Sequence, residues 1–472
     1  MEAVMENAII LAAGAGKRMH SDKPKVLMEV LGKPMLSWVT EACENAGIEN
    51  ICIVKGYGAE EIDSYLNGKY ETAFQSQRLG TGHAVICASD FLKKNPDGHT
   101  LVACGDSPFI DFKTIRAALE FHKLSGSAAT VITADSPNPY GYGRIVRKGG
   151  ELSAIVEERD CSPKERKIRE INSGCYWFDT EKLLEFLPLL TRENAQGEYY
   201  LTDTVALMSS KGLKVTAFKT DNSYAVLGAN DRKGLLKLND IARRRIIERH
   251  LENGVEFITT DGITITPDVK IGEGTKILPS TILTGNTVIG SGCVIGPNSR
   301  LENTVVGDDS TLDNVVAHDA TIGSHVSIGP FVQLRAGTVI KDYAHVGDFV
   351  EIKNSVIGEG TAVAHLTYVG DSDVGKNVNF GCGVVTVNYD GTNKARCTIG
   401  DNAFIGCNTN LIAPVTIGDC GYTAAGSTVT KNVPDGALAI ERSKLEIKEG
   451  YSEKKLARHI EKGKKLEKKL KD

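Results

Sequence analysis

The sequence of 472 residues predicts two folds in one chain: an α/β domain with a mostly parallel sheet, followed by a parallel β-helix. Short apolar runs alternate with helical stretches through the first 230 residues. Aliphatic–glycine pairs recur, many at multiples of six residues, from about residue 262 onward. The length also exceeds one ordinary core, so more than one domain is expected.

The composition is that of a water-soluble protein. The net charge is −5, and charged residues make up 24% of the chain. No apolar run approaches the roughly 20 residues of a membrane span, and the N-terminus lacks the charged-then-apolar pattern of a secretion signal, so we expect a cytoplasmic protein that is not secreted and has no membrane span. The eleven cysteines include no CxxC pair, which argues against a zinc site and against a disulfide framework. Free thiols are therefore expected.

The first domain, expected over 1–230, begins with alternating strands and helices. Buried strands are expected at 7–13, 51–56, 99–106 and 128–133, and helices at 35–47 and 112–126. In such sheets ligands bind at the C-terminal ends of the strands. The segments that follow the first and third strands, 14–25 and 104–108, are therefore candidate binding segments.

The stretch "LAAGAGKRMHSDKPKV" joins an apolar strand to two glycines and several cations. It is not a P-loop, because Gly14 and Gly16 are too close and Lys17 is followed by Arg18. It is not a dinucleotide fingerprint either, because position 19 is methionine. The pattern alone leaves open a phosphate cradle or a structural turn.

The second domain is expected over 253–443, after an amphipathic linker helix over 231–252. In each hexapeptide the aliphatic residue fills the coil interior, and a small residue takes the turn. Three hexads make one triangular coil, which gives about ten coils. Irregular spacings predict phase breaks and loops near 301–318 and 359–397.

The last segment, 444–472, is a lysine-rich tail with a weak helical pattern. We expect it to be solvated. It lacks the interleaved aromatic residues of nucleic-acid binders, so no nucleic-acid partner is expected.

Thirteen segments carry a resemblance to one family. They are "LAAGAGKRM", "KPKV", "QSQRLGTGHA", "GDSP", "GYGRI", "IVEERD", "EINSG", "AQGEYYLTD", "LGAND", "AHVGDFVEIKNS", "AHLTYVGD", "NYDGTNK" and "TAAGSTVTKNV". Together they resemble the bifunctional N-acetylglucosamine-1-phosphate uridyltransferase and glucosamine-1-phosphate acetyltransferases. The resemblance implies a left-handed β-helix, a homotrimer, and a role in peptidoglycan synthesis and cell shape.

The resemblance implies two reactions on small molecules. Glucosamine-1-phosphate is acetylated with acetyl-CoA, and UMP is then transferred from UTP to N-acetylglucosamine-1-phosphate, which gives UDP-N-acetylglucosamine and pyrophosphate. For the second reaction it implies that Arg18 and Lys25 act on the phosphates and that Asp106 and Asn230 hold Mg²⁺. The implied UTP and product positions are Leu11, Ala12, Ala13, Gly14, Lys25, Gln75, Gly80, Thr81, Gly143, Glu157, Asn172 and Asn230.

For acetyl transfer, the resemblance points to His365 as the general base, and Glu351 could orient it. The implied glucosamine-1-phosphate positions are Arg335, Lys353, Tyr368 and Asn379. The implied acetyl-CoA positions are Cys382, Asn388, Tyr389, Cys407, Ala425 and Arg442.

Three cysteines depart from the family pattern. Cys104 stands where the family often has tyrosine, and Cys382 and Cys407 stand where small residues are usual. Cys407 beside a thioester could be mistaken for a nucleophile, but no base adjoins it in sequence, which favours direct transfer. Two other functions stay open: a pyrophosphorylase for another base or sugar, such as glucose-1-phosphate, and a non-catalytic assembly subunit.

Overall fold

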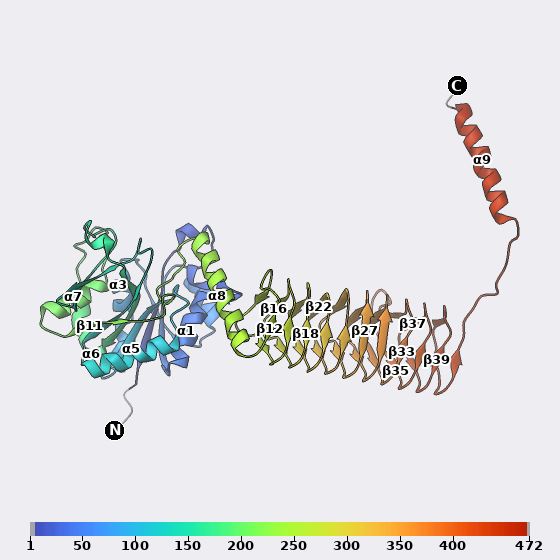
Figure 1. The fold of residues 1–472 in the computed structure, drawn as a ribbon, viewed down its shortest axis with the longest axis horizontal. Coiled ribbons are helices and arrows are strands. Elements are labelled where there is room, and N and C mark those ends of the chain that lie inside the picture. Colours follow the sequence, from blue (N-terminus) through green and yellow to red (C-terminus); the bar gives the residue numbers. More distant parts are fainter. Residues whose placement is uncertain (1–4, 470–472) are drawn as a thin grey trace. The chain divides into compact units, whose positions relative to one another are not determined.

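A computed structural model describes residues 5–469. Its contacts divide the chain into two units (Figure 1). The first unit runs to Asn253 and includes Thr264–Val269 and Leu283–Gly285; the second holds the remaining chain. The expected fold class is confirmed, with a parallel-sheet nucleotidyltransferase fold followed by a left-handed parallel β-helix. Within the described residues, no helix is long and apolar enough to cross a membrane.

The first unit is built on a nine-stranded sheet. The main path, in spatial order, is β11 (Val215–Lys219), β7 (Ala129–Asp135), β10 (Glu170–Asp179), β6 (His99–Cys104), β1 (Asn7–Ala12), β4 (Asn50–Lys55) and β5 (Glu71–Phe74). Strands β8 (Arg144–Lys148) and β9 (Glu151–Val156) form an antiparallel pair beside β10. β10 runs antiparallel to both β6 and β7, so the sheet is mixed at this point. A small separate hairpin joins β2 (Glu29–Val30) to β3 (Lys33–Pro34).

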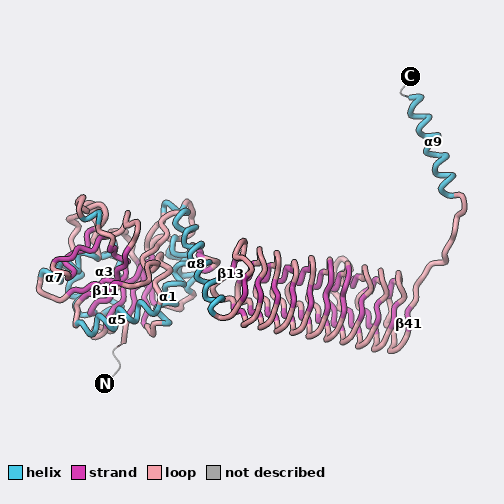
Figure 2. Tube along the Cα trace, in the orientation of Figure 1, coloured by secondary structure: helices cyan, strands magenta, loops and turns pink. Residues whose placement is uncertain are grey.

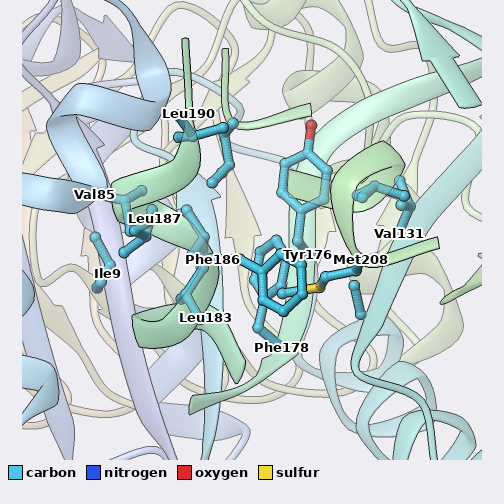
Figure 3. Close-up of a cluster of buried hydrophobic side chains, with 14 of the residues drawn as sticks. Ile9, Val85, Val131, Tyr176, Phe178, Leu183, Phe186, Leu187, Leu190 and Met208 are labelled. Carbon is cyan, nitrogen blue, oxygen red and sulfur yellow. The ribbon is translucent and has the colours of Figure 1, made fainter. Parts of the chain in front are cut away.

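Helices cover both faces of this sheet. One core cluster contains residues of α1 (Met35–Asn45), α2 (Ala59–Leu66) and α5 (Phe112–Ser125). The other contains residues of α3 (Thr81–Cys87), α4 (Ser89–Leu92), α6 (Thr180–Phe186) and α7 (Thr202–Ser210), and Figure 3 shows its centre around Phe178 and Phe186. Ile9 and Ile10 are neighbours in β1 but belong to different clusters, because successive strand residues face opposite sides. The apolar run of β1 is therefore buried on both faces, as expected for a central parallel strand.

The helix expected over 231–252 is α8 (Arg232–Glu252), and the Asp231 side chain caps it by accepting a hydrogen bond from Gly234 N at 2.8 Å. It is not a free-standing linker. It groups with the first unit, because it buries Leu238 and Ile246, and its Asn239 accepts a hydrogen bond from Leu31 N. Its apolar stripe therefore completes the first unit.

Three parallel sheets form the sides of the β-helix (Figure 2). The first holds β12 (Glu256–Phe257), β15 (Lys276–Ile277), β18 (Val294–Ile295), β21 (Thr311–Leu312), β24 (Ser327–Ile328), β27 (His345–Asp348), β30 (Ala362–His365), β33 (Asn379–Phe380), β36 (Phe404–Ile405), β39 (Tyr422–Thr423) and β41 (Leu438–Ala439). The second holds β13 (Thr264–Ile265), β16 (Ile282–Thr284), β19 (Arg300–Glu302), β22 (Val315–His318), β25 (Val332–Leu334), β28 (Glu351–Lys353), β31 (Tyr368–Gly370), β34 (Val385–Val387), β37 (Asn410–Ile412) and β40 (Thr428–Val429). The third holds β14 (Lys270–Ile271), β17 (Val288–Ile289), β20 (Val305–Val306), β23 (Thr321–Ile322), β26 (Val339–Ile340), β29 (Val356–Ile357), β32 (Ser372–Val374), β35 (Cys397–Ile399) and β38 (Val415–Ile417).

The coil interior follows the hexapeptide pattern. Ile295, Ile322 and Ile405 are buried, as expected for the aliphatic position. At the corners, buried hydroxyls bond to the next coil; Thr275 Oγ1, for example, donates to Gly290 O at 2.7 Å. Several asparagines, such as Asn314 and Asn408, adopt positive φ there, which asparagine tolerates better than most residues. The backbone N–H and C=O groups of each coil therefore find hydrogen-bond partners on the neighbouring coils.

The two irregular regions differ in kind. Near 301–318 there is no inserted loop: Thr311 pairs with Ser327, so the coil is shortened to 16 residues. Within 359–397 there is one insertion. Asn379 pairs with Phe404, a coil of 25 residues, and the extra residues form a loop closed by the hydrogen bond from Ala395 N to Asn388 O at 3.0 Å. Spacing alone could not distinguish a short coil from a loop.

Candidate functional site

The first candidate site lies where β1 and β6 end. A cavity of about 380 Å³ opens there. Its lining residues are Leu11, Ala13, Gly14, Gly16, Lys17, Arg18, Lys25, Val26, Gln75, Arg78, Gly80, Thr81, Ala84, Cys104, Asp106, Glu198 and Asn230. The structure thus brings together most of the nucleotide-binding residues expected from the sequence. Ala12 does not line the cavity, because its side chain is buried in the core on the α1 side of the sheet.

The glycine loop shapes this cavity around Lys25. Gly16 has φ +55°, and a Cβ there would lie 2.7 Å from Lys25 Cβ. A side chain at position 16 would therefore be strained and would displace Lys25. Two 3₁₀ turns, Lys17–Met19 and Lys25–Leu27, carry the basic residues that follow. The loop is thus more than a chain reversal, because it fixes a buried lysine.

The Lys25 ammonium joins Asp106 to Asn230. It forms an ion pair with Asp106 Oδ2 and donates a hydrogen bond to Asn230 Oδ1 at 2.7 Å. Two oxygen donors, one of them charged, therefore converge on a single cation. Such donors are the ligands that Mg²⁺ prefers, and Mg²⁺ typically takes few protein ligands beside substrate phosphates. Among the side chains that the structure describes, no cluster of three or more His, Cys, Asp or Glu is arranged to hold a metal.

Gln75 follows β5 and is fixed by its neighbours. Its Nε2 donates to Gly80 O at 3.0 Å and lies 3.1 Å from His83 Nδ1. Gly80 has φ +111°, and a Cβ there would lie 2.5 Å from Tyr199 O, so only glycine fits. Gln75 and Gly80 are therefore held together at the cavity wall, with an amide suited to a base edge.

Gly143, Glu157 and Asn172 form a group of their own. A Cβ on Gly143 would lie 3.3 Å from Glu157 Oε1 and 3.5 Å from Asn172 Cβ. Burial, with repulsion from Asp160 and Asp203, raises the pKa of Glu157. Cys104 lines the cavity and is also close enough to Glu157 to feel its charge, so it lies between the cavity and this group. Burial, with the charge of Asp106, raises the pKa of its thiol to about 12. The thiol is thus neutral and acts as a small packing residue.

The second candidate site is on the β-helix. His365 ends β30, and its Nδ1 lies 2.8 Å from Asp348 Oδ1, at the end of β27. The contact with His365 lowers the pKa of Asp348. Glu351, expected to orient His365, instead accepts a hydrogen bond from Arg335 Nη1 at 3.0 Å. Within this chain the carboxylate in contact with His365 is therefore Asp348, because Glu351 lies on the adjacent sheet, where its register partner in the preceding coil is Gln333.

A group of cations surrounds Lys353. Contact with Lys394, followed by desolvation, lowers the pKa of Lys353, and Arg335 adds to the repulsion. Asp371 lies 4.0 Å from Lys353 Nζ. Partial burial would raise the pKa of Asp371, but hydrogen bonds from Asn354 and Asn388 hold it below its usual range. Lys353 and Lys394 lie beside Asp371, and Arg335 is paired with Glu351, so three cations against two carboxylates leave one excess positive charge, which suits a phosphate.

Asn388 and Tyr389 open the inserted loop. Asn388 is buried, and its side chain donates a hydrogen bond to Asp371. Tyr389 is exposed, and its hydroxyl donates to Gly391 O at 2.6 Å. Tyr368 begins β31, directly beside Glu351 in the neighbouring coil. Tyr368 therefore lies on the same sheet as Lys353, and Asn388 and Tyr389 follow directly after a strand of that sheet, β34.

The expected acetyl-CoA positions follow one corner of successive coils. Backbone hydrogen bonds run from Gly383 N to His365 O, from Asn408 N to Cys382 O, and from Gly426 N to Cys407 O. They stack Cys382, Cys407 and Ala425 above His365, and Asn379 begins the strand that leads into Cys382. Arg442 is exposed and follows Glu441. Glu441 accepts a hydrogen bond from Thr428 N and donates one from its own N to Ser427 Oγ, so it is bonded to the residues that follow Ala425.

Sequence reasoning missed Asp348, Lys394, Asp371, Arg78 and Glu198. Asp348 was detectable, because it lies 17 residues before His365 and this is one coil length. Asp371 carries the same signal, because Asn354 and Asn388 each lie 17 residues from it, in the preceding and the following coil.

Comparisons with known proteins give two matches to families. Residues 7–229 match the family described as nucleotidyl transferase, and residues 268–303, 319–354 and 396–431 match the bacterial transferase hexapeptide family. The chain is 50% identical over 456 residues to "Bifunctional protein GlmU" of Acetivibrio thermocellus, covering 96% of this chain and 98% of that protein. It is 47% identical to the proteins of the same name from Geobacillus sp. and Clostridium kluyveri, covering 95% of this chain and 98% of each.

Proposed function

The chain belongs to the family of bifunctional GlmU proteins, and we propose that its two units perform the two transfers of UDP-N-acetylglucosamine synthesis. The β-helix acetylates glucosamine-1-phosphate with acetyl-CoA. The N-terminal unit then transfers UMP from UTP to N-acetylglucosamine-1-phosphate and releases pyrophosphate. The observation that carries the proposal is that both groups of polar residues are assembled in one chain that spans 98% of its relatives.

In uridyl transfer, the chain must hold two polyanions close together. Lys25, Arg18 and the backbone N–H groups of the glycine loop supply positive charge beside the triphosphate. Gln75 and Gly80 bind the base, and Gly143, Glu157 and Asn172 bind the N-acetyl sugar. Because these groups are fixed before substrate arrives, they stabilise the charge that develops during transfer without reorganising.

The same unit binds Mg²⁺ through Asp106 and Asn230. The support is that both oxygens already share one cation, the Lys25 ammonium. A bound ion would neutralise phosphate charge, and Lys25 would add its own positive charge beside the same phosphates. In the absence of Mg²⁺ the lysine keeps the two ligands together.

In acetyl transfer, the amine of glucosamine-1-phosphate attacks the thioester carbonyl, and the thiolate of CoA leaves. His365 removes the proton of the amine, and Asp348 stabilises the imidazolium that forms. Arg335 and Lys353 hold the sugar phosphate. The Cys407 thiol is exposed and is therefore accessible to a thioester. No base contacts this thiol among the described residues, so direct transfer from CoA to the amine is the simpler route.

We propose that the protein acts as a homotrimer in the cytoplasm. Support comes from exposed apolar side chains on consecutive coils, Phe331, Phe349 and Leu366, which are 56–59% exposed. Such a row is costly to leave in water and is suited to burial between subunits. Light scattering tests this proposal: a fully active monomer would contradict it.

A panel of sugar phosphates tests the choice of substrate. We expect UDP-sugar formation with N-acetylglucosamine-1-phosphate at a kcat/KM well above that with glucose-1-phosphate, because Glu157 and Asn172 lie beside Gly143 where an N-acetyl group would fit. Equal rates would favour a pyrophosphorylase of broader specificity. No turnover of any sugar phosphate would favour an assembly subunit.

A further inference from the structure

The last helix, α9 (Tyr451–Lys469), lies beyond the hexapeptide repeats and carries an unbalanced charge. Between residues 451 and 465 there are six lysine or arginine residues and two glutamates. All the side chains of this stretch are exposed, including Leu456 at 61% and Ile460 at 51%. Two large aliphatic side chains therefore lie in water beside a dense group of cations.

Three of the cations and the two aliphatic residues take opposite sides of α9. Leu456 and Ile460 are four residues apart and so share one face. Lys455, Arg458 and Lys462 are spaced by three and four residues and share the opposite face. A helix that is apolar on one side and cationic on the other is suited to lie in the interface of a membrane.

We propose that α9 docks this protein on an anionic lipid surface. The apolar face inserts at the boundary between headgroups and acyl chains, and the lysines and arginines contact lipid phosphates. This inference goes beyond the two transfer reactions and does not depend on them. It also differs from a membrane span, because the helix lies along the surface.

Charge and shape favour lipid over other occupants. A nucleic acid would engage the cations but would leave Leu456 and Ile460 in water, and α9 has no row of aromatic residues for stacking on bases. Pairing of two α9 helices would cover the apolar face but would bring lysine-rich helices together, which like charges oppose. An anionic bilayer satisfies both faces at once.

The segment before α9 supplies a tether. Residues 440–450 link β41 to α9 and form no regular element (Figure 2). Eleven residues span up to about 36 Å when extended. Leu445 and Ile447 in this segment are 82% and 77% exposed, so they add apolar contacts close to the helix. The tether lets α9 reach a surface while the β-helix keeps its fold.

Vesicle sedimentation tests the proposal with the full-length protein. Vesicles of phosphatidylglycerol and phosphatidylcholine in equal parts are compared with vesicles of phosphatidylcholine alone, at low salt and at high salt. We expect sedimentation with the anionic vesicles only, and weaker binding at high salt because exposed charges are screened. Reversing Lys455, Arg458 and Lys462 to glutamate should weaken binding by about 100-fold or more.

Two further variants separate the apolar contribution from charge. Leu456→Ser with Ile460→Ser keeps the net charge and should weaken binding by about tenfold. The matched control reverses three exposed lysines of the β-helix, Lys270, Lys341 and Lys431, to glutamate and should bind as the wild type does. Both transfer activities should persist in all these variants. Sedimentation with neither vesicle, equal sedimentation with both, equal loss in the control, or retention by duplex DNA in place of vesicles would each overturn the proposal.

Discussion

His365 and Asp348 are register partners in adjacent coils, and the Nδ1 atom of His365 lies 2.8 Å from Oδ1 of Asp348. An ionised carboxylate only accepts hydrogen bonds, so Nδ1 carries the hydrogen and donates to Asp348, which leaves the lone pair on Nε2. The His365 side chain is 60% exposed, so that acceptor is open to a substrate amine. The pair therefore has the arrangement required of an oriented general base.

Replacing His365 by alanine should slow acetyl transfer by about 10²–10⁴-fold, because a general base contributes about that factor. Uridyl transfer from preformed N-acetylglucosamine-1-phosphate should persist, since that site lies in the other unit. A thiol-release assay measures the first reaction and pyrophosphate release the second. A folded variant with wild-type acetyl transfer would exclude His365 as the base.

Asp348→Asn should lower kcat for acetyl transfer by about tenfold or more, because an amide stabilises the imidazolium less well than a carboxylate does. The KM for glucosamine-1-phosphate should change little, since Asp348 contacts His365 and not the cations around Lys353. Glu351→Gln is the matched control and should act mainly on KM, through Arg335. A larger fall in kcat for Glu351→Gln would return the orienting role to Glu351.

Asp106→Asn should abolish uridyl transfer and leave acetyl transfer intact. The substitution keeps the shape of the side chain but removes the charge that faces the cation beside Asn230. Chelation of divalent ions should reproduce this pattern in the wild type. The two reactions are assayed separately on the same preparation; parallel loss of both would mean that the sites are not independent.

The stability of the N-terminal unit should fall as pH drops below 6.5. Burial, followed by repulsion from His99, lowers the pKa of His122 to about 3. In the unfolded chain His122 becomes protonated near pH 6.5, whereas in the folded chain it becomes protonated only near pH 3. Between these two pH values protonation of His122 therefore favours unfolding. At pH 5 the cost is about 2 kcal/mol.

His122→Gln tests that prediction. Glutamine can still reach Thr130, which lies 2.8 Å from His122 Nδ1, but it does not titrate. In urea unfolding followed by fluorescence, the wild type should lose about 2 kcal/mol more than the variant between pH 7 and pH 5. Equal losses would remove His122 from the acid response.

Local pattern predicts most of the fold, because strand and coil residues show their burial in sequence. The runs at β1, β4 and β6 and the aliphatic positions of the coils are of this kind. The antiparallel direction of β10 has no such signal, since strand direction depends on how the chain returns to the sheet. Likewise, a phase break does not reveal whether a coil is shorter or carries a loop.

The sites divide in the same way. Family motifs point to Lys25, Asp106 and Asn230, but their contact joins residues up to 205 positions apart and becomes visible only in the folded chain. Asp348 sits outside the motif of His365 and reaches it through coil geometry. Predicting which side chains meet on adjacent coils therefore requires the pairing register of the strands, and the sequence shows this register only approximately.

The most direct measurement is a single reaction that starts from glucosamine-1-phosphate, acetyl-CoA and UTP with Mg²⁺, followed by mass spectrometry of the products. The wild type should form UDP-N-acetylglucosamine, CoA and pyrophosphate in equal amounts. Neither His365→Ala nor Asp106→Asn alone should approach that yield, whereas a mixture of the two should restore it through released N-acetylglucosamine-1-phosphate. Absence of UDP-N-acetylglucosamine with the folded wild type, or its full formation by either variant alone, would contradict the account of two separate sites in one chain.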